Sequence, residues 1–243
     1  MQHRTVRGKI RYLSKKPDSF NELRGTETFK FTHHADGRVV LRASCECELP
    51  EPKLLRDVLC AYDSDGRVED AYVRIMKADC FLGAGWYRRD GDFLEMEAWS
   101  PENGRVSLRE ASDRTFEDLG LHPVIGDGYM CRHVDPHNGP RQRRVKFQFC
   151  SPDHRGATPP TIAPLEAIIE YVGDETVTVA AGTFATHHYR YLDASAATPD
   201  KAHPPIDVWV TADGDCVYVK GRIGGYFMSE YELVEYQNVL PAG

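Results

Sequence analysis

The chain has 243 residues, a formal net charge of −7, and 41% hydrophobic and 28% charged residues. This composition is that of a globular protein with enough length to bury a substantial core. The negative charge argues against nonspecific binding to nucleic acid or to an anionic membrane. No run of about 18 apolar residues is present, so we expect no membrane-spanning helix, and the residues after Met1 lack the apolar stretch of a secretory signal.

Five tight turns punctuate the chain, each with an Asp-Gly or Asn-Gly pair: HADGR (34–38), DSDGR (63–67), RRDGD (88–92), PENGR (101–105) and TADGD (211–215). Glycine takes the positive φ that such turns require, and Asp or Asn tolerates it. Stretches of alternating β-prone residues flank each turn. The pattern predicts an all-β fold: an antiparallel meander that forms a barrel or two packed half-barrels, with few short helices.

Three segments carry mixed signals. Residues 54–63 (LLRDVLCAYD) fit either a short helix or a strand. Residues 112–121 (SDRTFEDLGL) begin with a capping residue and early acidic residues, which predicts one or two helical turns. Residues 163–172 (APLEAIIEYV) follow a proline-rich stretch and are predicted to form a strand.

The middle of the chain, about residues 120–162, is rich in Gly, Pro, His and Asp. Long irregular segments inside a compact domain are usually functional or mobile. We therefore expect one β-rich domain over residues 1–243, either undivided or made of two β-halves, 1–120 and 140–243, that this segment joins.

Residues 180–193 (AAGTFATHHYRYLD) and the hairpin that follows predict a sheet with one aliphatic and one polar-aromatic face, because successive side chains of a strand alternate. The polar-aromatic face is expected to hold Asp207, Trp209, Tyr218, Lys220 and Arg222. Either His188 with Arg190, or instead His187 with Tyr189 and Tyr191, would share it, and the sequence leaves both open. Such a face could grip the polar end of a ligand while a tryptophan packs its apolar part. The competing interpretation is a solvated outer face with cross-strand charge pairs.

This face suggests a cofactor-independent lyase, hydratase or isomerase that acts on a hydrophobic or aromatic small molecule. The candidate catalytic residues are His188, Asp207, Lys220, Arg222 and Tyr226, and the candidate substrate-binding residues are Trp209, Tyr189, Tyr218, Trp86 and Trp99. His188 or Tyr226 would move a proton, Asp207 would orient the base, and the two cations would stabilise developing negative charge. A carrier or sensor without turnover is the alternative.

A second alternative is a non-haem iron oxygenase. In CRHVDPH, the residues Cys131, His133, Asp135 and His137 would point one way if the chain were extended, with His188 or His154 as a further ligand. Pro136 and the nearby glycines favour an irregular loop instead. The sequence has no H-E-x-x-H, paired CxxC, G-x-S-x-G or phosphate-binding loop. We therefore expect neither a metal nor a cofactor.

Two motifs stand in the C-terminal third. The first is Val-x-Val-x-Ala-Gly-Thr-Phe, with Val177, Val179, Ala181, Gly182, Thr183 and Phe184; the second is the W-V-x-x-D-G hairpin with Trp209, Val210, Asp213 and Gly214. Over residues 171–237 the chain resembles a poorly characterised group of bacterial β-rich proteins. The resemblance implies an antiparallel, barrel-like fold and no catalytic residue. The overall layout is also similar to lipocalin-like hydratases and cyclases.

The seven cysteines are scattered and odd in number. Cys45 and Cys47 lie two apart on one face of an expected strand, where side chains do not bridge readily. We interpret them as reduced thiols and expect a cytoplasmic protein. Its expected partner is a small hydrophobic or aromatic molecule rather than nucleic acid or membrane, and a homodimer is allowed for.

Overall fold

The computed structural model describes residues 3–48, 51–111, 116–195 and 202–240. Its strands are β1 (His3–Ser14), β2 (Leu23–His34), β3 (Val39–Cys47), β4 (Leu54–Tyr62), β5 (Val68–Lys77), β6 (Cys80–Asp90), β7 (Phe93–Ser100), β8 (Gly104–Ala111), β9 (Phe116–Gly120), β10 (Gln142–Phe149), β11 (Ala163–Val179), β12 (Gly182–Asp193), β13 (Ile206–Thr211), β14 (Tyr218–Ile223) and β15 (Ser229–Val239). The helical elements are α1 (Val124–Met130) and two 3-10 turns, η1 (Pro17–Ser19) and η2 (Cys131–His133).

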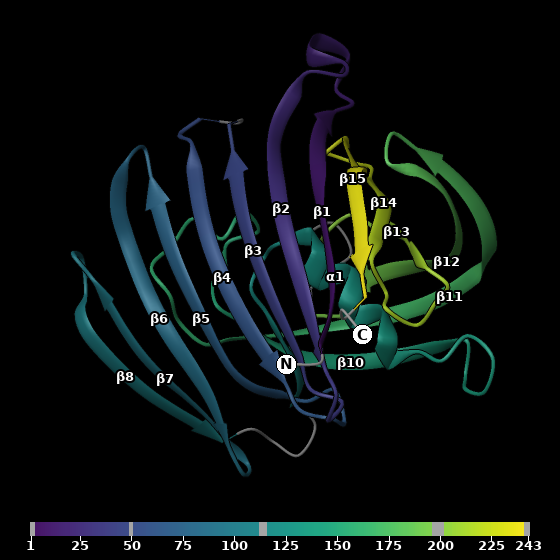
Figure 1. Ribbon diagram of the computed structural model, residues 1–243. Coiled ribbons are helices and arrows are strands. Elements are labelled where there is room, and N and C mark those ends of the chain that lie inside the picture. The colour runs from purple at the N-terminus through teal and green to yellow at the C-terminus, as the bar shows by residue number, and fades with distance from the viewer. Residues whose placement is uncertain (1–2, 49–50, 112–115, 196–201, 241–243) are drawn as a thin grey trace.

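All fifteen strands belong to one sheet, in the order β8-β7-β6-β5-β4-β3-β2-β1-β15-β14-β13-β12-β11-β10-β9. β1 pairs with β15, so the two ends of the chain meet in the middle of the sheet. The pairing is antiparallel except between β9 and β10. The strands curve around α1 (Figure 1), and β9 comes against β5, but the sheet does not close. The predicted all-β, antiparallel, barrel-like fold is confirmed.

The five predicted turns are confirmed. Each lies between consecutive strands that pair with one another. The glycines at these turns all have positive φ: Gly37, Gly66, Gly91, Gly104 and Gly214. Local chemistry therefore sets the hairpins, as the Asp-Gly and Asn-Gly pairs indicate.

The mixed segments resolve as strands. Residues 54–63 contain β4, and residues 163–172 form the first part of β11, as predicted for the latter. The prediction of helical turns near 112–121 is wrong for residues 116–120, which form β9, whereas 112–115 lie outside the described residues. β9 pairs with β10 and buries Asp118 and Leu119. These long-range contacts outweigh a helix-start signal that is only local.

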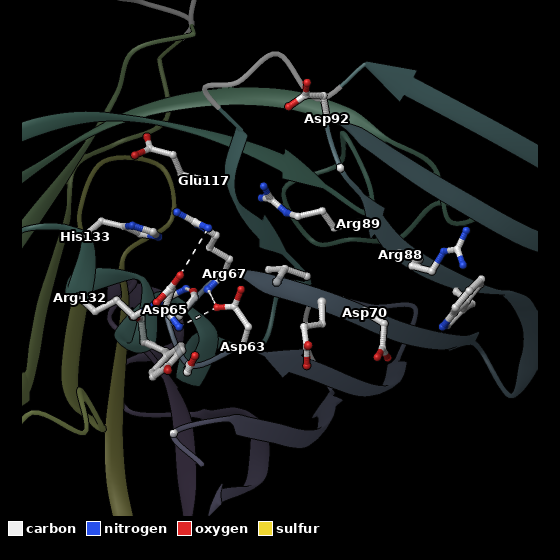
Figure 2. Close-up of a pocket in the computed structure, with 18 of the residues that line it drawn as sticks. Asp63, Asp65, Arg67, Asp70, Arg88, Arg89, Asp92, Glu117, Arg132 and His133 are labelled. Atoms are coloured by element: carbon white, nitrogen blue, oxygen red, sulfur yellow. Dashed lines mark hydrogen bonds and ion pairs between the residues drawn. The ribbon is translucent and has the colours of Figure 1, made fainter.

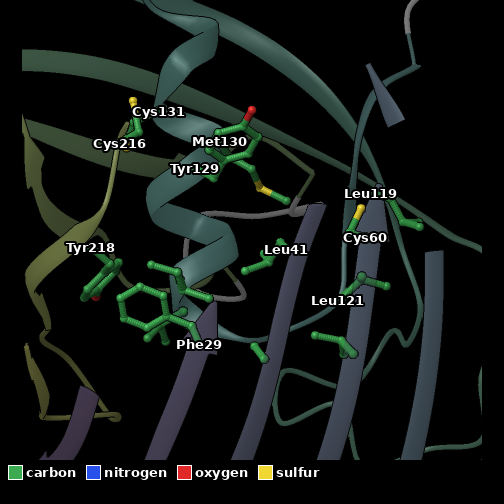
Figure 3. Packing of buried hydrophobic residues seen from close by; sticks show 14 of the residues in the cluster. Phe29, Leu41, Cys60, Leu119, Leu121, Tyr129, Met130, Cys131, Cys216 and Tyr218 are labelled. Atoms are coloured by element: carbon green, nitrogen blue, oxygen red, sulfur yellow. The ribbon is translucent and has the colours of Figure 1, made fainter. Parts of the chain in front are cut away.

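α1 lies on the inner face of the curved sheet, and we call the opposite face the outer face. The ring of Tyr129 packs 5.3 Å from that of Phe31 on β2 and 4.8 Å from that of Tyr62 on β4. On another side, a Cβ at Gly128 would stand 3.0 Å from the Cβ of Tyr218, so the helix meets β14 at its backbone. Figure 3 shows Tyr129 and Met130 of the helix with Tyr218 and Phe29 among the buried side chains near it. The helix therefore joins two walls of the barrel in one core.

A buried carboxyl, that of Glu27 on β2, holds the start of α1. It accepts hydrogen bonds from the backbone N–H groups of Val124 (2.9 Å) and Ile125 (3.0 Å), which have no partner inside the helix. It also accepts from the Tyr12 hydroxyl and from the Cys45 thiol at 3.3 Å. Burial raises the pKa of Glu27, and these hydrogen bonds act in the opposite direction. A side chain distant in sequence thus caps a helix that has no capping side chain of its own.

Candidate functional site

Two hollows are candidates for a site. One is a charged cleft of about 1360 Å³, which Figure 2 shows; residues of the β4–β5 and β6–β7 turns line it together with others on β5, β6, β9, η2 and β10. The other is an interior cavity of about 490 Å³, between α1 and strands β10 to β15. Roughly 300–1,000 Å³ is usual for small-molecule pockets, so the interior cavity is of ordinary size.

The charged cleft holds groups that largely satisfy one another. The guanidinium of Arg132 lies 2.7 Å from Asp118 and also donates to the carbonyl of Gly66 at 2.8 Å. His133 lies 2.9 Å from the same carboxylate, and Arg143 pairs with Glu117. Burial opposes the ionisation of Asp118, but Arg132 and His133 outweigh it and hold the pKa of Asp118 below its usual value. These contacts tie β9 and η2 to the β4–β5 turn, which is a structural role.

The interior cavity is different, because aromatic and aliphatic side chains form most of its wall. Phe147 and Phe149 come from β10, Tyr191 from β12, and Tyr218 and Tyr231 from the last two strands. Alternation along these strands turns the rings inward. The walls of the cavity therefore suit an apolar molecule.

The carboxyl of Asp127 on α1 faces this cavity, and it makes no hydrogen bond or ion pair within the described part of the chain. Its own backbone carbonyl accepts from the Tyr191 hydroxyl at 2.6 Å, which fixes the helix turn that carries it. Protein surrounds the side chain, and the surface that remains accessible lines the cavity. Burial, with the nearby Glu27 carboxyl, raises the pKa of Asp127 to about 8. At neutral pH the group is a protonated donor.

His122 is a second polar group without a full set of partners. Its Nε2 is buried and has no hydrogen-bond partner among the described residues. Burial and the neighbouring Arg56 lower the pKa of His122 to about 3, so the ring is neutral. Its backbone has a φ of 74°, in the left-handed region that histidine, asparagine and aspartate enter more often than other non-glycine residues. The cavity therefore contains a carboxylic acid and a neutral imidazole.

Aromatic residues surround the exposed end of the cavity. Tyr226 is 62% exposed, and its ring lies 4.9 Å from that of Phe227. The ring of His203 lies 4.8 Å from Phe227, and that of His154 lies 5.0 Å from it on another side. Of the predicted catalytic residues, Tyr226 is the one that lines this cavity.

The other predicted catalytic residues, His188, Asp207, Lys220 and Arg222, gather on the outer face. The register places His188, Trp209 and Lys220 side by side on β12, β13 and β14. The rings of His188 and Trp209 stack at 4.2 Å, and Nε2 of His188 lies 2.9 Å from Asp207. Arg222 lies over the Trp209 ring at 5.8 Å. The structure thus brings this group together, but away from the cavity.

The prediction that Tyr218 lies on the polar-aromatic face is wrong. Alternation along an unbroken strand would set it beside Lys220, but the register of β13 and β14 shifts between these positions. Trp209 pairs with Lys220 and Val210 pairs with Tyr218, so one extra residue, Val219, stands between them. This irregularity turns Tyr218 to the inner face, where it lines the cavity. Tyr189 is also inside, and its hydroxyl donates to the carbonyl of Val134 at 3.1 Å.

The remaining predicted residues lie apart from both groups. Trp86 lines the charged cleft, and Trp99, on β7, is 52% exposed and stacks on Phe81.

The extended chain that the iron alternative requires for 131–137 is absent, and the irregular conformation that Pro136 favours is present, because Cys131–His133 form the 3-10 turn η2. Asp135 accepts from the backbone N–H of His137 at 2.8 Å, as in a turn, while His133 binds Asp118. His188 is on the outer face, and His154 is at the rim of the cavity. Within the described ranges, no three His, Cys, Asp or Glu residues are placed to hold a metal.

We expect replacement of His188 with glutamine to leave small-molecule binding in the interior cavity within threefold of wild type. The ring contacts only outer-face groups, so its loss costs cross-strand contacts worth about 1 kcal/mol. Fluorescence titration of an apolar probe, together with urea denaturation, measures both effects. A loss of binding above tenfold would instead place the site on the outer face.

Sequence reasoning overlooked Asp127, His122 and Glu27. A signal for Glu27 exists, because it shares one face of β2 with Phe29 and Phe31. A charged residue in an apolar row is a buried carboxyl that needs partners. No comparable signal marks the other two, since their segment has neither strand nor helix periodicity.

Comparison with known proteins bears on the fold. The chain is similar to a β-barrel-like protein of the domain of unknown function DUF1849 from Brucella abortus, with a TM-score of 0.58 and 10% identity over 98% of this chain and 97% of that one. A DUF1089 family protein from Pseudomonas aeruginosa gives a TM-score of 0.48 and 10% identity over 83% of this chain and 90% of that one. No family model matches the sequence, and no curated protein does.

At such low identity the first of these likenesses concerns the fold alone. It is consistent with the expected resemblance to poorly characterised bacterial β-rich proteins, whereas the two quoted motifs stay a prediction. In the described residues, no helix has the length and apolar character needed to cross a bilayer. The chain shares a barrel-like, antiparallel β fold with the Brucella protein.

Proposed function

We propose that this protein binds a small, largely apolar molecule in the interior cavity. The observation that carries this proposal is a cavity of about 490 Å³ with aromatic walls that also contains a carboxyl, Asp127, without a partner among the described residues. Apolar walls supply binding free energy in proportion to the area they cover, and a single polar group orients the molecule. A role as a carrier or sensor requires nothing further.

Filling the cavity tests the proposal. Ala167 on β11 is buried and lines the cavity, so Ala167→Leu places additional carbon atoms in it. We expect this variant to weaken binding of the uncharged probe N-phenyl-1-naphthylamine at least tenfold in a fluorescence titration. Ala185→Leu is the matched control, because Ala185 is exposed on β12 and lines neither hollow. Equal affinity in Ala167→Leu, Ala185→Leu and the wild type would contradict the proposal.

An acid–base enzyme, such as a lyase, hydratase or isomerase, is the second candidate. The observation in its favour is the proximity to one cavity of a protonated carboxyl, Asp127, and a neutral imidazole, His122. A protonated acid can donate to a reacting group, and a neutral imidazole can accept. Mass spectrometry of candidate aromatic molecules after incubation separates the two functions. A carrier returns its ligand unaltered, and an enzyme loses turnover in Asp127→Asn.

A further inference from the structure

The interior cavity has an asymmetric set of polar groups. Three carboxyls line it, those of Asp127, Asp153 and Asp193, whereas no lysine or arginine does among the described residues. A cavity that received a carboxylate or phosphate would need a cation or a row of N–H groups directed at it. The charge of these walls disfavours an anionic ligand.

Two of the three carboxyls, those of Asp153 and Asp193, accept hydrogen bonds from backbone N–H groups. Asp153 accepts from the backbone N–H groups of Arg155 (2.7 Å) and Ala157 (3.4 Å). Its partial burial acts against ionisation, but these bonds prevail and hold the pKa of Asp153 below its usual value. Asp193 accepts from the N–H groups of Ser195 (2.8 Å) and His203 (2.9 Å). The carboxylate of Asp153 thus keeps its negative charge where it lines the cavity.

Within the part of the chain that the structure describes, no lysine or arginine stands near Asp127 to balance a charge on it. The groups that face Asp127 from neighbouring elements are Glu27 of β2, Tyr191 of β12, Tyr218 of β14 and Tyr231 of β15, with Cys131 following on η2. None of these is positive. The neutral ring of His122 does not compensate either, and burial lowers the pKa of His203 as well.

We propose that the ligand of the interior cavity is an amine: an apolar, ring-sized body with a protonated amino group that pairs with Asp127. This inference rests on the proposed binding function and adds the chemical class of the ligand. An ammonium group would supply a positive charge at a carboxyl that no described residue pairs with. The rings of Tyr191, Tyr218 and Tyr231 line the same space and can contact a cation through their faces.

The pairing gives binding a defined pH dependence. Free Asp127 holds its proton below about pH 8 and must release it when the ammonium group arrives. Affinity for an amine therefore rises with pH up to that point, about tenfold per unit when the carboxyl is ionised in the complex. An alkylamine keeps its charge throughout, since its pKa is near 10, as for lysine.

Three molecules that differ in one group test the inference: 4-phenylbutylamine, 4-phenylbutanol and 4-phenylbutanoate, each titrated into the whole protein by calorimetry. We expect the amine to bind at least tenfold more tightly than the alcohol at pH 7.5, and the carboxylate to bind most weakly. Between pH 6.0 and 7.5 the amine should gain about 30-fold, with one proton released per site in buffers of different ionisation enthalpy.

Asp127→Asn should lose the preference for the amine and its pH dependence, while the alcohol binds within threefold of wild type. Asp57→Asn, an exposed site on β4, is the control for the same change in charge. An alternative result is that the alcohol or the carboxylate binds as tightly as the amine or more tightly, with that binding lost in Ala167→Leu. This result would contradict the amine as the ligand class and leave the proposed binding function of the cavity intact. Absence of all binding, including that of the uncharged probe, would overturn the proposed function itself.

Discussion

Replacement of Glu27 with alanine is expected to lower the free energy of unfolding by about 4 kcal/mol. The change removes the acceptor that four buried donors share: two N–H groups at the start of α1, the Tyr12 hydroxyl and the Cys45 thiol. The Tyr12 hydroxyl keeps a second, longer contact to the Cys45 sulfur at 3.7 Å. Each such group costs about 1–3 kcal/mol when its partner is lost. The expected loss of stability is smaller than the sum of these four costs, because burial already disfavours the ionised Glu27 carboxyl in the wild type. Urea denaturation at pH 7 measures the difference.

Two variants control this experiment. Glu27→Gln keeps the shape and one acceptor oxygen, so we expect a loss of about 2 kcal/mol. Glu46→Ala, an exposed site on β3, should change stability by less than about 0.5 kcal/mol. Because α1 carries Asp127 and Met130 of the cavity wall, Glu27→Ala should also weaken probe binding. A loss of stability below about 1 kcal/mol in Glu27→Ala would show that α1 docks without this cap.

Replacement of Asp127 with asparagine is expected to stabilise the protein by about 2 kcal/mol at pH 7. In an unfolded chain the pKa of an aspartate is about 3.9, and in the folded protein burial raises that of Asp127 to about 8. Between these values the folded state binds more protons than the unfolded state. Stability therefore falls as pH rises through this window.

The size of the effect follows from the same shift. About three pKa units separate the unfolded value from pH 7, which sets an upper limit of about 4 kcal/mol. The cavity admits water to the carboxyl, so roughly half of that limit should remain. Denaturation curves at pH 4.5 and pH 7.5 should show Asp127→Asn level with wild type at the lower pH and more stable at the higher. Glu27 contributes a slope of the same sign, which persists in the variant.

Asp57→Asn separates this effect from a simple change in net charge, because Asp57 is exposed on β4. We expect it to leave the pH dependence of stability unchanged. If Asp127→Asn is no more stable than wild type at pH 7.5, the carboxyl has a partner at that pH. The gain in stability also matters for function, since many ligand sites cost the fold some stability.

Much of the fold was predictable from the sequence, because the features that set it are local. The Asp-Gly and Asn-Gly pairs supply the positive φ that tight turns need, and alternation in segments such as TETFKFTHH follows the two-residue period of a strand. The row of His188, Trp209 and Lys220 follows from the same alternation. Where a register shift interrupts it, at Val219, the prediction for Tyr218 placed the ring on the wrong face.

The cavity and its groups depend on the tertiary structure. α1 is seven residues long and contains Gly126 and Gly128, so its intrinsic helix propensity is low and no amphipathic period marks it. It forms because Glu27, nearly a hundred positions earlier in the chain, accepts its first N–H groups and because Tyr129 packs between β2 and β4. The same closure buries Asp127 and shifts its pKa.

The sequence alone therefore predicted the five hairpin turns and the strands on either side of them, since neighbouring residues set φ preferences and alternation. The three-dimensional fold, by contrast, sets which face encloses a cavity, because the curvature of the whole sheet separates the inner face from the outer face. The fold also sets which carboxyl groups are desolvated. Desolvation depends on groups that the chain brings together over long separations, so no local pattern around Asp127 could reveal it.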